Sequence, residues 1–128
     1  MNERLFVYGS LMVGQPSAHL LAGAAFIGPA ATTAGYTLLA LPPGYPGLRP
    51  GGATSVRGEL FTVGPALLER LDAFEGHPDL FGRGQVHLVG GATAVAYLMS
   101  PATAETYRLA PVVPHGDWRR FCEPRGRR

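Results

Sequence analysis

The sequence predicts an α+β fold, a small mixed β-barrel-like sheet with short flanking helices. Segments rich in apolar and β-branched residues recur between glycine- and proline-containing breaks, and one stretch has a clear helical period. These segments alternate too irregularly for a doubly wound sheet. A chain of 128 residues suits one compact domain. We therefore expect a single domain over residues 1–122 and a basic, poorly ordered tail over residues 123–128.

The first half of the chain predicts strands and one short helix. Residues 4–8 form a continuous apolar run, which is typical of a buried strand. A short helix is expected over residues 17–22. Residues 25–41 are expected to hold one or two strands, interrupted near Gly35. The Pro-Pro-Gly-Tyr-Pro-Gly sequence of residues 42–47 predicts a rigid loop, because it suits neither a helix nor a central strand.

The middle of the chain predicts a strand followed by a helix. In the strand, residues 53–63, alternation places Leu60 on one face and Glu59 on the other. The helix begins at Pro65, since proline is favoured at the first helical position, and ends at Gly76. Its inward-facing stripe has four members at helical spacing: Leu67, Leu68, Leu71 and Phe74.

The last third predicts a hairpin and an irregular end. Residues 85–89 and 92–99 have strand character and are joined by Gly90-Gly91, a common hairpin signal. From residue 101 onward the chain is expected to be rich in loops, with one turn of helix near residues 117–121.

Composition excludes several function classes. The chain has no lysine, so it has neither a P-loop nor a Schiff-base lysine. Its four histidines lack metal-ligand spacing, and Cys122 is the single cysteine, so we expect no metal, no cofactor and no internal disulfide. No apolar stretch is long enough to span a membrane, and the expected location is the cytoplasm.

The turn after the first strand is one candidate for chemistry. In Tyr8-Gly9-Ser10-Leu11, the glycine allows a sharp turn that exposes successive backbone N–H groups, and Ser10 adds a hydroxyl donor. Such groups can cradle a carboxylate or an oxyanion. From these residues alone, a plain turn at the end of a strand remains an open alternative.

Glu75 is the second candidate. At helical spacing it projects between Leu68 and Leu71, which places a carboxylate on the apolar stripe. Desolvation and the C-terminal end of the helix dipole both raise the pKa of such a group, as a base acting near neutral pH requires. The residues alone leave open that Glu75 bends out to water or pairs with an arginine such as Arg83.

Taken together, the ordered motifs resemble those of the γ-glutamylcyclotransferase-like (AIG2-like) family. They are residues 8–11 (Tyr-Gly-Ser-Leu), 56–60 (Val-Arg-Gly-Glu-Leu) and 71–76 (Leu-Asp-Ala-Phe-Glu-Gly). Arg83 follows at the family's spacing. Three further matches extend the resemblance over nearly the whole chain: Tyr45-Pro46, Tyr97 and the Gly-Asp-Trp of residues 116–118.

The resemblance implies a reaction in which the α-amine of a γ-glutamyl group attacks its own γ-carbonyl, releasing 5-oxoproline and an amine or amino acid. Glu75 is implied as the proton acceptor. The implied substrate-binding residues are Tyr8, Gly9, Ser10, Leu11, Tyr45, Phe81 and Arg83. Phe81 departs from the family pattern, because many relatives have a tyrosine there, and the lost hydroxyl bears on which leaving group is accepted.

Other readings remain. A protein of the same fold can bind a small acidic metabolite or a partner protein without catalysis. The same chemistry can also remove a γ-glutamyl protecting group from a biosynthetic intermediate. Nucleic-acid binding is less favoured: residues 119–128 hold five arginines and one glutamate, but no basic face is evident behind them.

Overall fold

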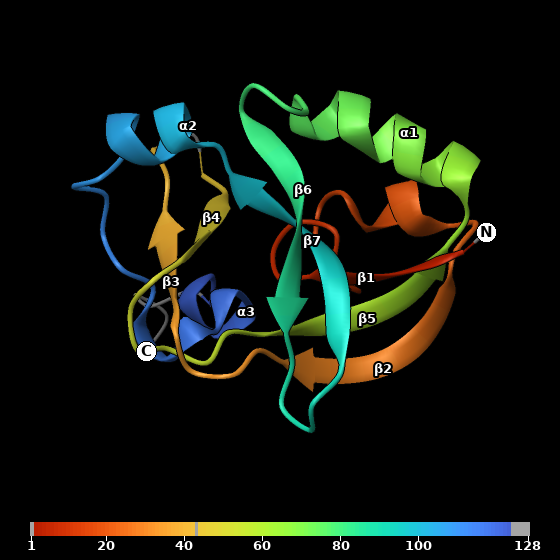
Figure 1. Ribbon diagram of the computed structural model, residues 1–128, viewed down its shortest axis with the longest axis horizontal. Helices are drawn as coiled ribbons and strands as arrows, with labels where there is room; N and C mark the ends of the chain where they lie inside the picture. Colours follow the sequence, from red (N-terminus) through yellow and green to blue (C-terminus); the bar gives the residue numbers. More distant parts are fainter. Residues whose placement is uncertain (1, 43, 124–128) are drawn as a thin grey trace.

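The computed structural model describes residues 2–42 and 44–123, and over these the chain is a mixed sheet with short helices around it (Figure 1). The strands are β1 (Glu3–Val7), β2 (Ala25–Ala31), β3 (Tyr36–Ala40), β4 (Pro46–Pro50), β5 (Arg57–Val63), β6 (Phe81–His87) and β7 (Thr93–Met99). The α-helices are α1 (Pro65–Glu75), α2 (Pro101–Thr106) and α3 (Trp118–Phe121), and two 3-10 turns are η1 (Ala18–Leu21) and η2 (Pro114–Gly116). The α+β prediction is confirmed.

The main sheet curls into a barrel. Its strand order is β2-β5-β1-β7-β6, with β1 and β7 parallel and the other neighbours antiparallel. The ends of the two edge strands meet, since the N–H of Thr33 donates to the carbonyl of His87 at 2.9 Å and the N–H of Val89 donates to the carbonyl of Ala31 at 2.9 Å. The smaller β3-β4 sheet lies with α2 and α3 at the end away from α1 (Figure 1).

Most predicted elements are confirmed, with two exceptions. Residues 46–50 form β4, so the rigid loop predicted for residues 42–47 ends earlier than expected. Pro46 is accommodated because β3 and β4 form a sheet of two strands, in which every strand is an edge. The helix α2 was also not predicted; Ser100 caps it by accepting a hydrogen bond from the N–H of Thr103 at 3.1 Å.

The helix that carries Glu75 is bounded as the sequence predicts. Pro65 is its first residue, and Gly76 ends it in the left-handed conformation with φ of 69°. Leu67, Leu68 and Leu71 are buried, but Phe74, predicted to face inward, is about half exposed. The apolar stripe of α1 is therefore buried only up to Leu71, and its last turn, with Phe74 and Glu75, lines a cavity instead.

Candidate active site

A cavity of about 390 Å³ opens where five segments meet. These are the end of β1 with the loop that follows it, the loop entering β4, the last turn of α1, the turn entering β6, and β7, which contributes Tyr97. The lining comprises Phe6, Val7, Tyr8, Gly9, Ser10, Leu11, Pro16, Ser17, Gly44, Tyr45, Pro46, Phe74, Glu75, Leu80, Phe81 and Tyr97. Its size is that of a small-molecule site.

Glu75 is the carboxylate of this lining, and it ends α1 on the side that faces the cavity. Burial raises the pKa of Glu75 from its ordinary 4.5 to about 7. The alternative that Glu75 pairs with Arg83 is not what the structure has, because Arg83 binds Asp72 instead. A carboxylate with this pKa is divided between its two protonation states near neutral pH, which suits it to exchange protons.

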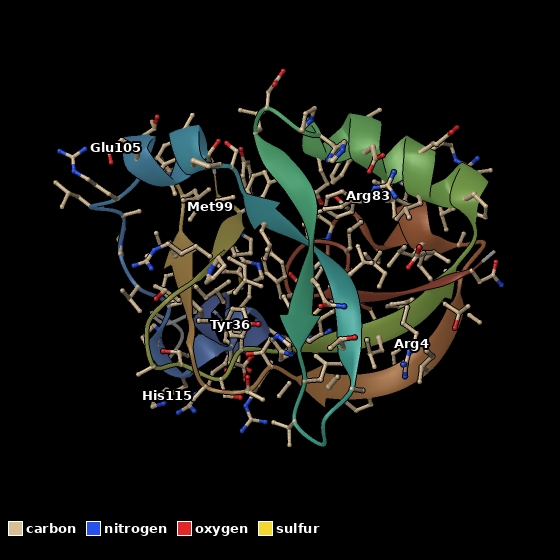
Figure 2. The ribbon with its side chains drawn as sticks, in the orientation of Figure 1. Arg4, Tyr36, Arg83, Met99, Glu105 and His115 are labelled. Carbon is tan, nitrogen blue, oxygen red and sulfur yellow. The ribbon has the colours of Figure 1, made fainter. Side chains whose placement is uncertain are left out.

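Asp72 and Arg83 form a bidentate ion pair one helical turn before Glu75. Arg83 donates from Nε to Oδ1 of Asp72 at 2.9 Å and from a terminal nitrogen to Oδ2 at 2.6 Å. Tyr97 adds a third hydrogen bond, from its hydroxyl to Oδ1 of Asp72 at 2.6 Å. Figure 2 shows Arg83 beside α1. The network ties the end of α1 to β6 and β7 and so fixes the position of Glu75.

The network separates the pKa values of Asp72 and Glu75, two of the carboxylates on α1. Burial alone would raise the pKa of Asp72, but the hydrogen bonds from Arg83 and Tyr97 outweigh it and hold that pKa below its ordinary value. Glu75 has burial without such partners, so its pKa moves the other way. Asp72 and Glu75, one turn apart, therefore have pKa values shifted in opposite directions, which suits the first to remain an anion and the second to exchange protons near neutral pH.

The turn after β1 presents unused backbone donors to the cavity. Among the described residues, no hydrogen bond outside the helices and strands has the N–H of Gly9, Ser10 or Leu11 as its donor. The Tyr8 hydroxyl donates to the carbonyl of Tyr97 at 2.6 Å, and burial, followed by the nearby charge of Glu75, raises the pKa of Tyr8 well above its ordinary value. Tyr8 therefore remains protonated, and the turn retains free N–H groups that can receive an anion.

Glu59 holds the segment that follows this turn through a hydrogen bond to Val13. Glu59 lies on the face of β5 opposite Leu60, as the alternation predicts, and its side chain is buried. Its Oε1 accepts the N–H of Val13 at 2.8 Å, and its Oε2 accepts from Arg119 at 3.1 Å. Arg119 also donates to the carbonyl of Val13 at 2.7 Å. Both polar groups of one loop residue are therefore held, which orders the segment that lines the cavity.

The structure brings together all but one of the site residues predicted from the sequence. The exception is Arg83, which lies outside the cavity lining with its guanidinium committed to Asp72. Phe81 is buried in the wall and contacts Tyr45 edge to face, with ring centroids 6.1 Å apart. Sequence reasoning did not identify Phe74 and Leu80 as lining residues, since nothing in a local pattern marks an apolar side chain as facing a cavity.

The structure also bears on other classes of site that the sequence raised. In residues 2–42 and 44–123, no group of three or more histidine, cysteine, aspartate or glutamate side chains is arranged to hold a metal ion. None of the helices there combines the length and apolar character that crossing a membrane requires. Cys122 is exposed. The nucleic-acid hypothesis is based on residues 119–128. Of these, Arg119 and Arg120 belong to α3, and residues 124–128 lie outside the described residues.

Comparisons with known proteins agree with the fold and the motifs. The family model described as gamma-glutamyl cyclotransferase, AIG2-like, matches residues 5–120. A putative gamma-glutamylcyclotransferase of Vibrio cholerae is 34% identical over 118 residues, covering 92% of this chain and 96% of that protein. A gamma-glutamylaminecyclotransferase of Bos taurus is 38% identical over 122 residues, covering 89% of this chain and 68% of that protein.

A solved structure has the same architecture. An AIG2-like protein of Mus musculus superposes with a TM-score of 0.76 at 28% identity, covering 99% of each chain. The residues that the family model matches, 5–120, include α1, the strands around the cavity and most of β1. The chain therefore belongs to the gamma-glutamyl cyclotransferase, AIG2-like family.

Proposed function

We propose that this protein is a cofactor-independent γ-glutamyl cyclotransferase. In the reaction, the α-amine of the γ-glutamyl group bonds to the γ-carbonyl carbon and the original amide bond breaks. The products are 5-oxoproline and a free amine or amino acid. Because the nucleophile and the electrophile belong to one substrate molecule, the protein needs chiefly to hold a reactive conformer and to move a proton. The similarity to a putative gamma-glutamylcyclotransferase and to a gamma-glutamylaminecyclotransferase supports the same reaction class.

Glu75 is the proton carrier in this proposal, and its placement is the observation that carries it. As the new C–N bond forms, Glu75 takes a proton from the attacking amine. As the amide bond breaks, Glu75 gives that proton to the departing nitrogen, so protons balance over the cycle. A pKa of about 7 supports both steps, since the group can accept and release a proton at neutral pH.

The turn of Gly9, Ser10 and Leu11 binds the α-carboxylate of the substrate through its backbone N–H groups. This role is supported by the absence of competing acceptors in the described residues. The Ser10 hydroxyl lies in the same lining, and in this proposal it donates to the oxyanion of the tetrahedral intermediate. The substrate is thereby held at one end by the turn while Glu75 acts at the other.

A purely binding role for the same fold is less well supported. Such a role would be favoured by a pocket filled with Phe81 or Tyr97. Both side chains instead stand in the wall of a cavity of about 390 Å³ that includes Glu75. A buried carboxylate without a charged partner carries a cost in stability, which a proton-transfer role would explain.

The test is release of 5-oxoproline from a panel of γ-glutamyl amides and γ-glutamyl amino acids. The wild type is expected to turn over at least one member. Glu75→Gln keeps the shape and removes the base, so we expect kcat to fall by roughly 10²- to 10⁴-fold. Glu69→Gln, which changes an exposed carboxylate of the same helix, is the matched control and should be as active as the wild type. Equal rates for Glu75→Gln and wild type would refute the role of Glu75.

A further inference from the structure

The mouth of the cavity is apolar and open to solvent. Three large apolar side chains in its lining are exposed: Tyr45 at 37%, Phe74 at 49% and Leu80 at 54%. They come from three different segments, the loop before β4, the last turn of α1 and the turn before β6. Separate segments that converge to expose apolar surface around one cavity mark a place where a ligand covers it.

The aromatic wall extends inward from this mouth. Phe81 is buried behind Tyr45, with the two rings edge to face. This geometry is one that aromatic side chains prefer. Phe81 itself supplies no hydroxyl, so its side chain offers a ligand apolar contact alone.

The lining offers no positive charge at this end. Among the described residues it contains no arginine and no histidine, and its one carboxylate is Glu75. The arginine on the neighbouring strand, Arg83, is committed to Asp72 by two hydrogen bonds. A carboxylate brought into the mouth would therefore lose water without gaining a charged partner, and it would face the negative form of Glu75.

From these observations we infer that the preferred substrates are γ-glutamyl amides of apolar, aromatic amines that have no carboxylate on the leaving group. The inference rests on the proposed function. The turn after β1 receives the α-carboxylate of the γ-glutamyl group, and the remaining wall of Tyr45, Phe74, Leu80 and Phe81 receives the departing amine. The chemistry is unchanged: the amide C–N bond breaks, and the amine leaves with the proton that Glu75 returns.

The test compares three substrates by 5-oxoproline release. γ-Glutamylphenethylamine and γ-glutamylphenylalanine differ only by the carboxylate on the leaving group, and γ-glutamylethylamine lacks the ring. We expect kcat/KM for the phenethylamine derivative to exceed each of the other two by about tenfold or more. A phenylalanine derivative that reacts equally well or faster would overturn the inference, and so would an ethylamine derivative that matches the phenethylamine one.

Two variants locate the effect at the mouth. Leu80→Arg places a cation at the mouth and should lower the ratio of kcat/KM for the phenethylamine derivative to kcat/KM for the phenylalanine derivative. The uncharged Leu80→Gln should not lower this ratio in the same way. Leu80 is exposed, so both changes are compatible with folding. A ratio that both variants alter equally would contradict the inference.

A shortened chain and the wider panel complete the design. A chain ending at residue 123 should keep the wild-type ratio, because the inference assigns the preference to Tyr45, Phe74, Leu80 and Phe81, which this chain retains. Loss of the ratio would overturn the inference. If the three substrates are inert but another γ-glutamyl compound releases 5-oxoproline, the inference fails while the proposed function stands. If no γ-glutamyl compound reacts, the proposed function fails, and the inference fails with it.

Discussion

Replacing Glu75 by glutamine should make the protein more stable at alkaline pH while abolishing its activity. The folded protein raises the pKa of Glu75 from 4.5 to about 7 by burying it. Between these two values the folded state holds a proton that the unfolded state has released. Stability therefore falls as pH rises from about 4.5 through about 7, and above this range the full cost of a buried charge is present.

The size of this cost follows from the pKa difference. One pKa unit corresponds to about 1.4 kcal/mol, so a pKa of about 7 instead of 4.5 costs at most about 3.5 kcal/mol. Because the side chain retains some exposure, solvent screening reduces this amount, and we expect about 1–3 kcal/mol. Glutamine cannot ionise, so Glu75→Gln should gain this free energy of unfolding at pH 8.5. At pH 4 the wild-type carboxyl is protonated and the gain should disappear.

Urea unfolding of the wild type and Glu75→Gln at pH 4 and pH 8.5 measures the difference directly. Glu69→Gln removes the same charge from an exposed position of α1 and controls for the change in net charge. The quantity of interest is the difference in stabilisation between the two pH values, which cancels any effect of the amide itself on packing. If that difference is zero, or equals the one for Glu69→Gln, Glu75 is not a desolvated acid and the reasoning about its pKa is refuted.

Three further outcomes are expected. The kcat/KM of the wild type should rise with pH through about 7, as Glu75 loses its proton, and a pH-rate profile that is flat from pH 5.5 to 8 would contradict this assignment. Asp72→Ala should free Arg83 to approach Glu75, so that kcat/KM rises at a lower pH than in the wild type. The double variant Asp72→Ala with Arg83→Gln should return this pH towards the wild-type value. If Asp72→Ala alone leaves the pH profile unshifted, the role given to the ion pair is contradicted. Gly9→Ala should destabilise the fold by about 1–3 kcal/mol and raise KM, because the new methyl group would lie 2.5 Å from Cγ of Pro46, as denaturant unfolding and steady-state kinetics can check.

The elements with strong local signals could be predicted from the sequence. The helix α1 has a proline at its start, an apolar stripe and a left-handed glycine at its end, so its bounds follow from backbone chemistry alone. The strand β4 could not be predicted in this way. Pro46 and Pro50 are poor strand residues unless the strand lies at an edge, and the edge arises only when β3 and β4 pair.

The site residues also divide into those that local sequence patterns predict and those that depend on tertiary packing. Glu75 could be identified because its place on an apolar stripe is visible in the spacing of neighbouring residues. The side of the sheet that Glu59 faces could not, because period-2 alternation assigns relative faces and does not say which face a distant loop and Arg119 will cover. The exposure of Phe74 likewise depends on where α1 passes beyond the core, which only the packed structure determines.

Asp72 and Glu75 of α1 together explain why the protein can keep an acid without a charged partner at its cavity. A salt bridge between Arg83 and Glu75 would lower the pKa of Glu75 and remove its capacity to carry a proton at neutral pH. Asp72 engages Arg83 instead, since it accepts hydrogen bonds from Nε and from one terminal nitrogen of the guanidinium, and it accepts a third from the Tyr97 hydroxyl. The stable ion pair therefore does more than fasten the helix. By occupying Arg83, it leaves burial as the dominant influence on Glu75, so the basicity of the proposed catalytic group depends on a neighbour that does not line the cavity.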